Sequence, residues 1–121
     1  QRIALAQARV ATQQAAQAKQ AAQELVAWLD THPRDALAWI TLAGAYQMSG
    51  DGLRSLRAQA EARLVELDYA AAIDRFKAAQ DWAIQLAKEG KLDRAGHMEA
   101  SIIDTRLRQS EQLRREQVLQ R

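Results

Sequence analysis

The two histidines are the side chains with the widest range of chemistry, since an imidazole binds metal or moves protons near neutral pH. A zinc protease helix needs two histidines one turn apart with a glutamate between them, in the pattern H-E-x-x-H. His32 and His97 lie far apart in the sequence, and neither is part of such a pattern. We therefore expect no zinc and no other cofactor in this chain. His32, beside Pro33, is expected to contact the carbonyls of a helix end, and His97 to be solvated or locally bonded.

Other catalytic patterns are missing from the sequence as well. It contains no G-x-S-x-G and no phosphate-binding loop, and Gly50-Asp51-Gly52 reads as a turn. The absence of cysteine excludes thiolate chemistry. Asp74, Asp81 and Asp104 lie among arginines, so they are expected to be exposed ion-pair partners. The sequence thus predicts a chain that is not an enzyme by itself.

The composition predicts one all-α domain over residues 1–121. Of these residues 26 are alanine, only one is proline and 5% are aromatic, which favours helices over a sheet. The 17 Lys and Arg against 15 Asp and Glu do not indicate nucleic acid. No apolar run is long enough to insert into a membrane. Because no leader precedes Gln1, we expect the chain to be soluble and part of a longer protein.

Breaks in the helical pattern divide the chain into a long Ala- and Gln-rich helix over 1–30, a repeat core over 35–88 and a C-terminal helix within 93–121. Asp35 and Asp68 are the expected N-caps. The end of the last helix is expected to be solvated and frayed. The expected helices span 1–30, 35–49, 53–67, 69–88 and 93–120.

A repeat signature appears in the second helix. Trp39, Leu42, Ala43 and Tyr46, followed by Gly50 in a turn, resemble the helix-turn-helix unit of tetratricopeptide repeats (TPR). Its second-helix half recurs as Tyr69, Ala72, Phe76 and Ala79. A strict repeat period places a first helix at Tyr69, but the residues there match a second helix. The helix over 53–67 must therefore act as the repeat partner of both the helix before it and the helix after it, in half-repeat steps. The resemblance implies a TPR-like α-α superhelix, and we expect Trp28, Trp39 and Trp82 in its core.

A narrower resemblance covers most of the chain. The strings starting at His32, Arg57, Asp68 and Glu99, which read HPRDALAW, RAQAEA, DYAAAIDR and EASIIDTRL, resemble the C-terminal TPR region of bacterial periplasmic Ste24-like zinc metalloproteases, the β-barrel assembly-enhancing protease (BepA) family. The resemblance implies a periplasmic location and recognition of substrates or partners during outer-membrane protein quality control. Zinc is then expected only in a protease domain that this chain lacks.

The resemblance also implies a concave groove lined by first helices. On a phasing from Ala36, one helix contributes Leu37, Ile40, Gly44 and Gln47, with Met48 beside them. Apolar Leu37 and Ile40 are unusual on a solvated face, so they bind a partner or are covered by the N-terminal helix or a second copy. Arg54, Arg57 and Glu61 either add polar contacts to a peptide or are solvated, and solvation is the more common role of such charged side chains.

The first helix has a further consequence for assembly. Nothing turns the chain near Ala16, so 1–30 is expected to form one helix about 45 Å long. Its stripe of small residues suits close antiparallel pairing with a second copy, which predicts a homodimer. The stripe comprises Ala4, Ala8, Ala11, Ala15, Ala18, Ala22, Leu25 and Leu29.

The leading functional hypothesis is a non-catalytic module that binds a protein or peptide segment. The alternative within that class is a free-standing TPR adaptor or chaperone. An Arg-rich nucleic-acid-binding helical bundle is the alternative from another class, and it draws on the arginines from Arg106 to Arg121. No base-stacking aromatics lie near those arginines, so no nucleic-acid partner is expected.

Overall fold

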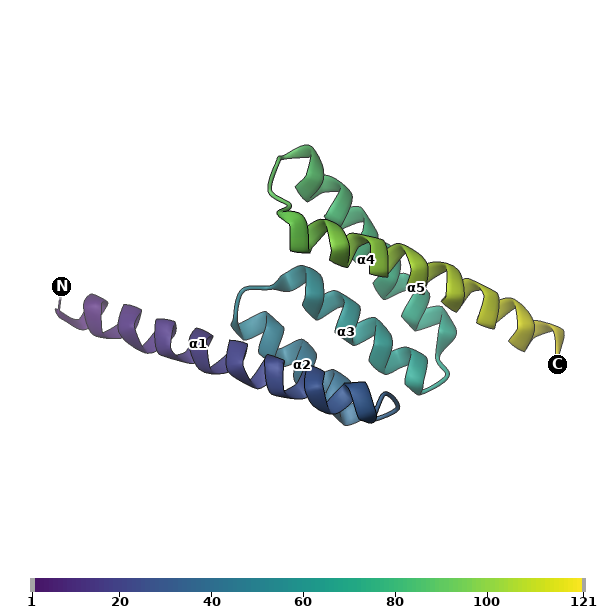
Figure 1. Ribbon diagram of the computed structural model, residues 1–121, viewed down its shortest axis with the longest axis horizontal. Coiled ribbons are helices and arrows are strands. Elements are labelled where there is room, and N and C mark those ends of the chain that lie inside the picture. The colour runs from purple at the N-terminus through teal and green to yellow at the C-terminus, as the bar shows by residue number, and fades with distance from the viewer. Residues whose placement is uncertain (1, 121) are drawn as a thin grey trace.

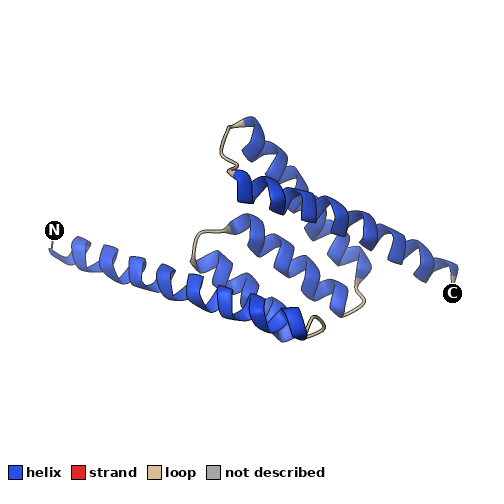
Figure 2. Ribbon diagram, viewed as in Figure 1, coloured by secondary structure: helices blue, strands red, loops and turns tan. Residues whose placement is uncertain are grey.

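The computed structural model describes residues 2–120, and this part of the chain is all-α (Figures 1 and 2). It confirms the expected five helices and the long first helix. No helix in it is both long and apolar enough to cross a membrane. The helices are α1 (Arg2–Thr31), α2 (Ala36–Met48), α3 (Gly52–Val65), α4 (Tyr69–Lys88) and α5 (Arg94–Leu119).

Each helix packs against the next one in the sequence, and α3 also touches α5. In the view of Figure 1, α1 passes in front of α2 and α5 in front of α4. Because the connections are short, neighbouring helices run antiparallel. The face that carries α1, α3 and α5 is therefore distinct from the face that carries α2 and α4.

Aspartate caps begin four of the helices. The side chains of Asp35, Asp51, Asp68 and Asp93 each accept a hydrogen bond from the backbone N–H three residues later. The bond from Ala38 N–H, together with one from the Trp28 indole, lowers the pKa of Asp35. Since Trp28 belongs to α1, Asp35 both starts α2 and ties it to α1.

Left-handed residues end the helices that precede three turns. Gly50, Leu67 and Gly90 have φ of 82°, 64° and 68°, and glycine is the usual residue there because it has no Cβ. Leucine rarely takes this conformation, so the sequence pattern gives no sign of a helix end near Leu67 and predicts a helix that is too long. The expected end at residue 67 is wrong: α3 ends at Val65 because the chain reverses at Leu67.

Alanine dominates the helix contacts. Ala58, Ala60, Ala72 and Ala79 are at most 1% exposed, and small side chains let helices approach closely. Larger side chains fill the gaps between them, and the largest fully buried ones include Phe76, Leu42 and Ile103.

The tryptophans lie further out than expected. Trp28 and Trp82 are 47% and 41% exposed, so the core prediction is wrong for both, whereas Trp39 is half-buried. Trp28 stacks on His32 at a centroid distance of 3.6 Å and donates from Nε1 to Asp35 at 2.9 Å. A surface partner for the indole N–H removes the need for burial.

Helix α1 is continuous, as expected from the missing turn near Ala16. Its C-terminal part packs on α2 and buries Ala18, Ala22 and Leu29. Residues 2–17 are exposed, except for a half-buried Ala15. The structure contains one copy of the chain, so the homodimer through α1 stays a prediction.

Two glycine substitutions test this packing. A Cβ on Gly52 would overlap the ring of Trp82, whereas one on Gly44 meets nothing within 4 Å. We expect Gly52→Ala to lower the free energy of unfolding by about 1–3 kcal/mol through displacement of the ring. Gly44→Ala, the matched control, should raise it by about 0.5–1 kcal/mol. Urea titration followed by tryptophan emission measures both, and equal effects would contradict the close contact.

Candidate functional site

The eight residues expected to line a groove do not lie together. Leu37, Ile40, Gly44, Gln47 and Met48 are exposed on α2. The other three, Arg54, Arg57 and Glu61, are half-buried or buried on α3 and contact α5. The structure therefore divides the predicted set between two surfaces.

The exposed side of α2, which we call the α2 face, is open in the monomer. Leu37 and Ile40 are 72% and 52% exposed, so α1 does not cover them. Beside Ile40, a shallow pocket of about 250 Å³ extends to Arg63 and Arg75.

A buried ion pair joins α3 to α5. Arg106 on α5 donates from Nε and Nη2 to the Glu61 carboxylate, at 2.9 and 2.6 Å. The Glu61 side chain is only 5% exposed. The expectation that Glu61 is solvated is therefore wrong, since two-point binding by a guanidinium replaces its water.

A second carboxylate on α5 lies beside the same arginines. Glu99 Oε2 is 3.3 Å from Arg57 Nε, and its Oε1 is 3.7 Å from Arg54 Nε. Arg57 Nε and Glu99 Oε2 are buried but form no hydrogen bond within the described residues. Burial raises the pKa of Glu99, and the positive charges of Arg57 and Arg54 only partly oppose this.

Two aromatic residues flank these arginines. Trp39 and Tyr46 lie seven positions apart on α2, which places them on the same side of the helix. The Arg57 guanidinium lies over the Trp39 ring, 5.9 Å from its centroid. Burial raises the pKa of Tyr46.

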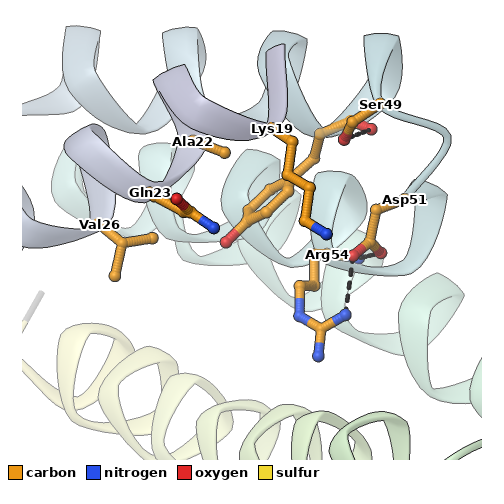
Figure 3. A pocket seen from close by; sticks show the side chains of 8 residues that line it. Lys19, Ala22, Gln23, Val26, Ser49, Asp51 and Arg54 are labelled. Carbon is orange, nitrogen blue, oxygen red and sulfur yellow. Dashed lines mark hydrogen bonds and ion pairs between the residues drawn. The ribbon is translucent and has the colours of Figure 1, made fainter. Parts of the chain in front are cut away.

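The first of two pockets on this side lies between α1 and the α2–α3 turn (Figure 3). Its volume is about 510 Å³. Lys19 and Gln23 point into it from α1, and Asp51 and Arg54 face them (Figure 3). Tyr46 also lines it. We call it the cationic pocket.

The second pocket, which we call the indole pocket, lies at the other end of α2 and has a volume of about 860 Å³. It is formed by α2, α3, α5 and the α1–α2 turn, and it includes both charged and apolar side chains. Among them are Arg34, Trp39, Arg57, Glu61, Arg106 and Leu113.

The two pockets lie near the two ends of α2, on either side of the charged cluster, and we refer to them together as the groove. Tyr46 and Arg54 line the cationic pocket, and Trp39 and Arg57 line the indole pocket. Arg54 and Arg57 are one helical turn apart and both reach Glu99, so the charged cluster forms the floor between the pockets. A groove with aromatic, apolar and cationic side chains has the composition of a protein-binding surface.

Sequence reasoning found only part of this groove. It assigned Trp39 and Tyr46 to the repeat core, and it did not single out Lys19, Glu99 or Arg106 as site residues. The 45 positions between Glu61 and Arg106 leave no local spacing signal for their contact. The seven-residue step from Trp39 to Tyr46 was the signal that could have indicated a shared face.

The histidines take no part in this groove. His32 Nδ1 lies 3.1 Å from the carbonyl oxygen of Trp28, which confirms its helix-end position. His97 is exposed in the first turn of α5. Within residues 2–120, no group of three potential ligands is placed to hold a metal ion.

The two buried glutamates should respond differently to loss of charge. Glu61→Gln removes the carboxylate bound by Arg106 and should lower the free energy of unfolding by roughly 3 kcal/mol. Glu99→Gln should cost less at neutral pH, because burial already disfavours the charged form of Glu99. Urea denaturation at pH 7 compares the two variants, and the opposite order would contradict this account.

The pH dependence has a definite sign. Because the pKa of Glu99 is raised above 4.5 in the folded state, its stabilising contribution is complete below pH 4.5 and is lost as the pH rises through the folded pKa. The Glu99→Gln variant should lack this loss. A carboxyl NMR titration of Glu99 with a midpoint at or below 4.5 would contradict it.

Comparison with known proteins identifies no family. No protein-family model, curated protein or solved structure matches the chain significantly. What the structure and these comparisons establish together is an all-helical domain of five helices packed in sequence, with pockets near the two ends of α2.

Proposed function

We propose that the chain is a non-catalytic protein-interaction module that holds a segment of a partner protein in the groove between α1 and α5. The observation that carries this proposal is the pair of pockets on either side of the charged cluster, each with an aromatic side chain and at least one arginine. Such side chains dominate the binding energy of protein interfaces. A flexible segment fits this groove better than a flat protein surface does, because both pockets are concave.

We further propose that the helices form a TPR-like superhelix. The sequential packing of antiparallel helices supports this, as does the burial of Leu42 and Ala43 at signature positions. The signature phasing from Ala36 makes α2 a first helix, whereas the two pockets lie along α1, α3 and α5, so the ligand side proposed here differs from the one that the resemblance implies. The half-repeat phasing agrees with a superhelix, because α3 then serves the units on both sides.

The resemblance to the BepA family narrows the proposal further. The chain is then the partner- or substrate-recognition region of a bacterial periplasmic zinc metalloprotease acting in outer-membrane protein quality control. A free-standing adaptor or chaperone is the alternative. The coding sequence upstream of Gln1 separates them: we expect a signal peptide and an H-E-x-x-H helix there, and a coding region with neither would overturn the narrower proposal.

A binding experiment tests the groove against the α2 face. Peptides selected from a random phage library on the immobilised chain are measured by fluorescence anisotropy. Leu113→Asp, a change in the indole pocket, should weaken binding by about tenfold or more, because it replaces an apolar side chain of the contact surface with a charged, hydrated one. Leu37→Asp, the matched control on the α2 face, should leave binding unchanged.

The outcomes separate the possible surfaces. Loss of binding in the Leu37→Asp variant alone would assign the ligand to the α2 face and overturn the groove. The absence of any selected peptide would overturn the interaction module itself. Circular dichroism of both variants checks that the helices remain formed.

A further inference from the structure

The charge along the groove is unbalanced. Its lining includes five cationic side chains, whereas three carboxylates lie in it or in its floor. The cations are Lys19, Arg34, Arg54, Arg57 and Arg106, and the carboxylates are Asp51, Glu61 and Glu99. A ligand of negative charge is therefore favoured.

The cationic pocket contributes two of these cations, Lys19 and Arg54, against the single carboxylate of Asp51. Asp51 is already used: it accepts from the Arg54 backbone N–H at 3.1 Å and from Arg54 Nη1 at 2.7 Å. Lys19 forms no ion pair with any described residue, and its ammonium points toward this pair (Figure 3). The Gln23 amide lies beside it (Figure 3). A carboxylate entering the pocket would meet a lysine that is free to bind it.

The indole pocket has a different character. Apolar side chains from three helices, Trp39, Leu64 and Leu113, line it together with Arg57. An apolar ligand side chain packed there would bury the indole face that Arg57 leaves accessible. Arg34, Glu61 and Arg106 line the same pocket, so its apolar side chains stand among charged ones.

The rise along α2 between Trp39 and Tyr46, which line one pocket each, gives an order-of-magnitude spacing for the ligand. Trp39 and Tyr46 are seven residues apart, which is about 10 Å along a helix. An extended chain covers about 10 Å in three residues. The two ligand side chains are therefore expected three positions apart.

The face of α1 that carries Lys19 extends beyond the cationic pocket. Leu5, Ala8 and Thr12 line a further hollow of about 350 Å³ on α1. Steps of three, four and seven residues place them on the same face of α1 as Lys19. A chain bound at Lys19 can thus continue along α1, which favours an acidic side chain within a segment over a terminal carboxylate.

The N-terminal helix of a second copy is a poor occupant. Residues 2–18 contain Arg2 and Arg9 and no acidic residue. A cationic helix would be repelled by the surplus charge of the groove. Nucleic acid is disfavoured as well, because three carboxylates lie along the same surface.

On the basis of the proposed function, we propose that the groove binds an extended acidic segment of a partner protein. An Asp or Glu side chain of that segment occupies the cationic pocket against Lys19. An apolar side chain three residues away occupies the indole pocket beside Trp39.

The test uses labelled peptides and the full chain in fluorescence anisotropy. The reference peptide has Leu and Asp three positions apart within a Gly/Ser sequence. We expect it to bind about tenfold more tightly than peptides with Asn for Asp or with the two residues adjacent. It should also bind more tightly than a peptide in which only a C-terminal carboxylate replaces the Asp, and than single-stranded DNA.

Lys19→Glu provides the matched protein variant, because Lys19 is exposed and no contact within the described chain depends on it. It should weaken the reference peptide by about tenfold and leave the Asn peptide unchanged. Lys77→Glu, an equal charge reversal on exposed α4 surface, should change neither. Loss of affinity should also follow added salt.

Failure of this inference differs from failure of the interaction module. Equal binding of the Asp and Asn peptides, equal effects of the two lysine variants, or tighter binding of the C-terminal carboxylate or of DNA would each overturn it. If library-selected peptides of another chemistry still lose affinity in the Leu113→Asp variant, the module stands and only the acidic ligand is wrong.

Discussion

The ionic contacts between α3 and α5 hold open the groove on which every functional argument depends. Helices adjacent in the sequence are kept together by short turns and apolar packing, but α3 and α5 are separated by α4. Glu61 bound by Arg106, and Glu99 beside Arg54 and Arg57, connect the two helices directly. They fix α5 as the wall of the groove opposite α1 and set the positions of the arginines in both pockets.

The small core side chains explain why so many large residues are available at the surface. Alanine at the crossings brings the helix axes close together and leaves little room for indoles or long aliphatic chains between them. Trp39 and Tyr46 are consequently only half-buried at the edge of their cluster. Close helix packing and a groove lined by aromatic residues are thus two results of the same composition.

Local signals predicted most of the helices, and long-range contacts account for what was missed. Aspartate caps and glycine breaks gave the helix boundaries within about two residues, because the interactions that decide them span three or four positions. The end of α3 was misplaced since a leucine takes a left-handed conformation that sequence patterns assign to glycine. The burial of Glu61 and the exposure of Trp28 depend on partners, Arg106 and Asp35, that no helical period identifies. The candidate groove was therefore only partly predictable: Arg54, Arg57 and Glu61 were noted as site residues, but Arg106 and the face on which they meet were not.

Burying these ion pairs costs desolvation free energy. A protein with apolar residues of similar volume in place of Glu61, Glu99 and their arginines would often be as stable or more stable. Such a replacement would, however, convert the floor between two concave pockets into a continuous apolar strip. An exposed strip of that kind binds other apolar surfaces without selectivity and promotes aggregation. The ion pairs leave the floor polar while most of their charge is internally compensated. Selectivity then comes from Lys19, the one cation in the cationic pocket with no internal partner. A ligand group binds there only if its interaction with the Lys19 ammonium is stronger than the hydration that it displaces.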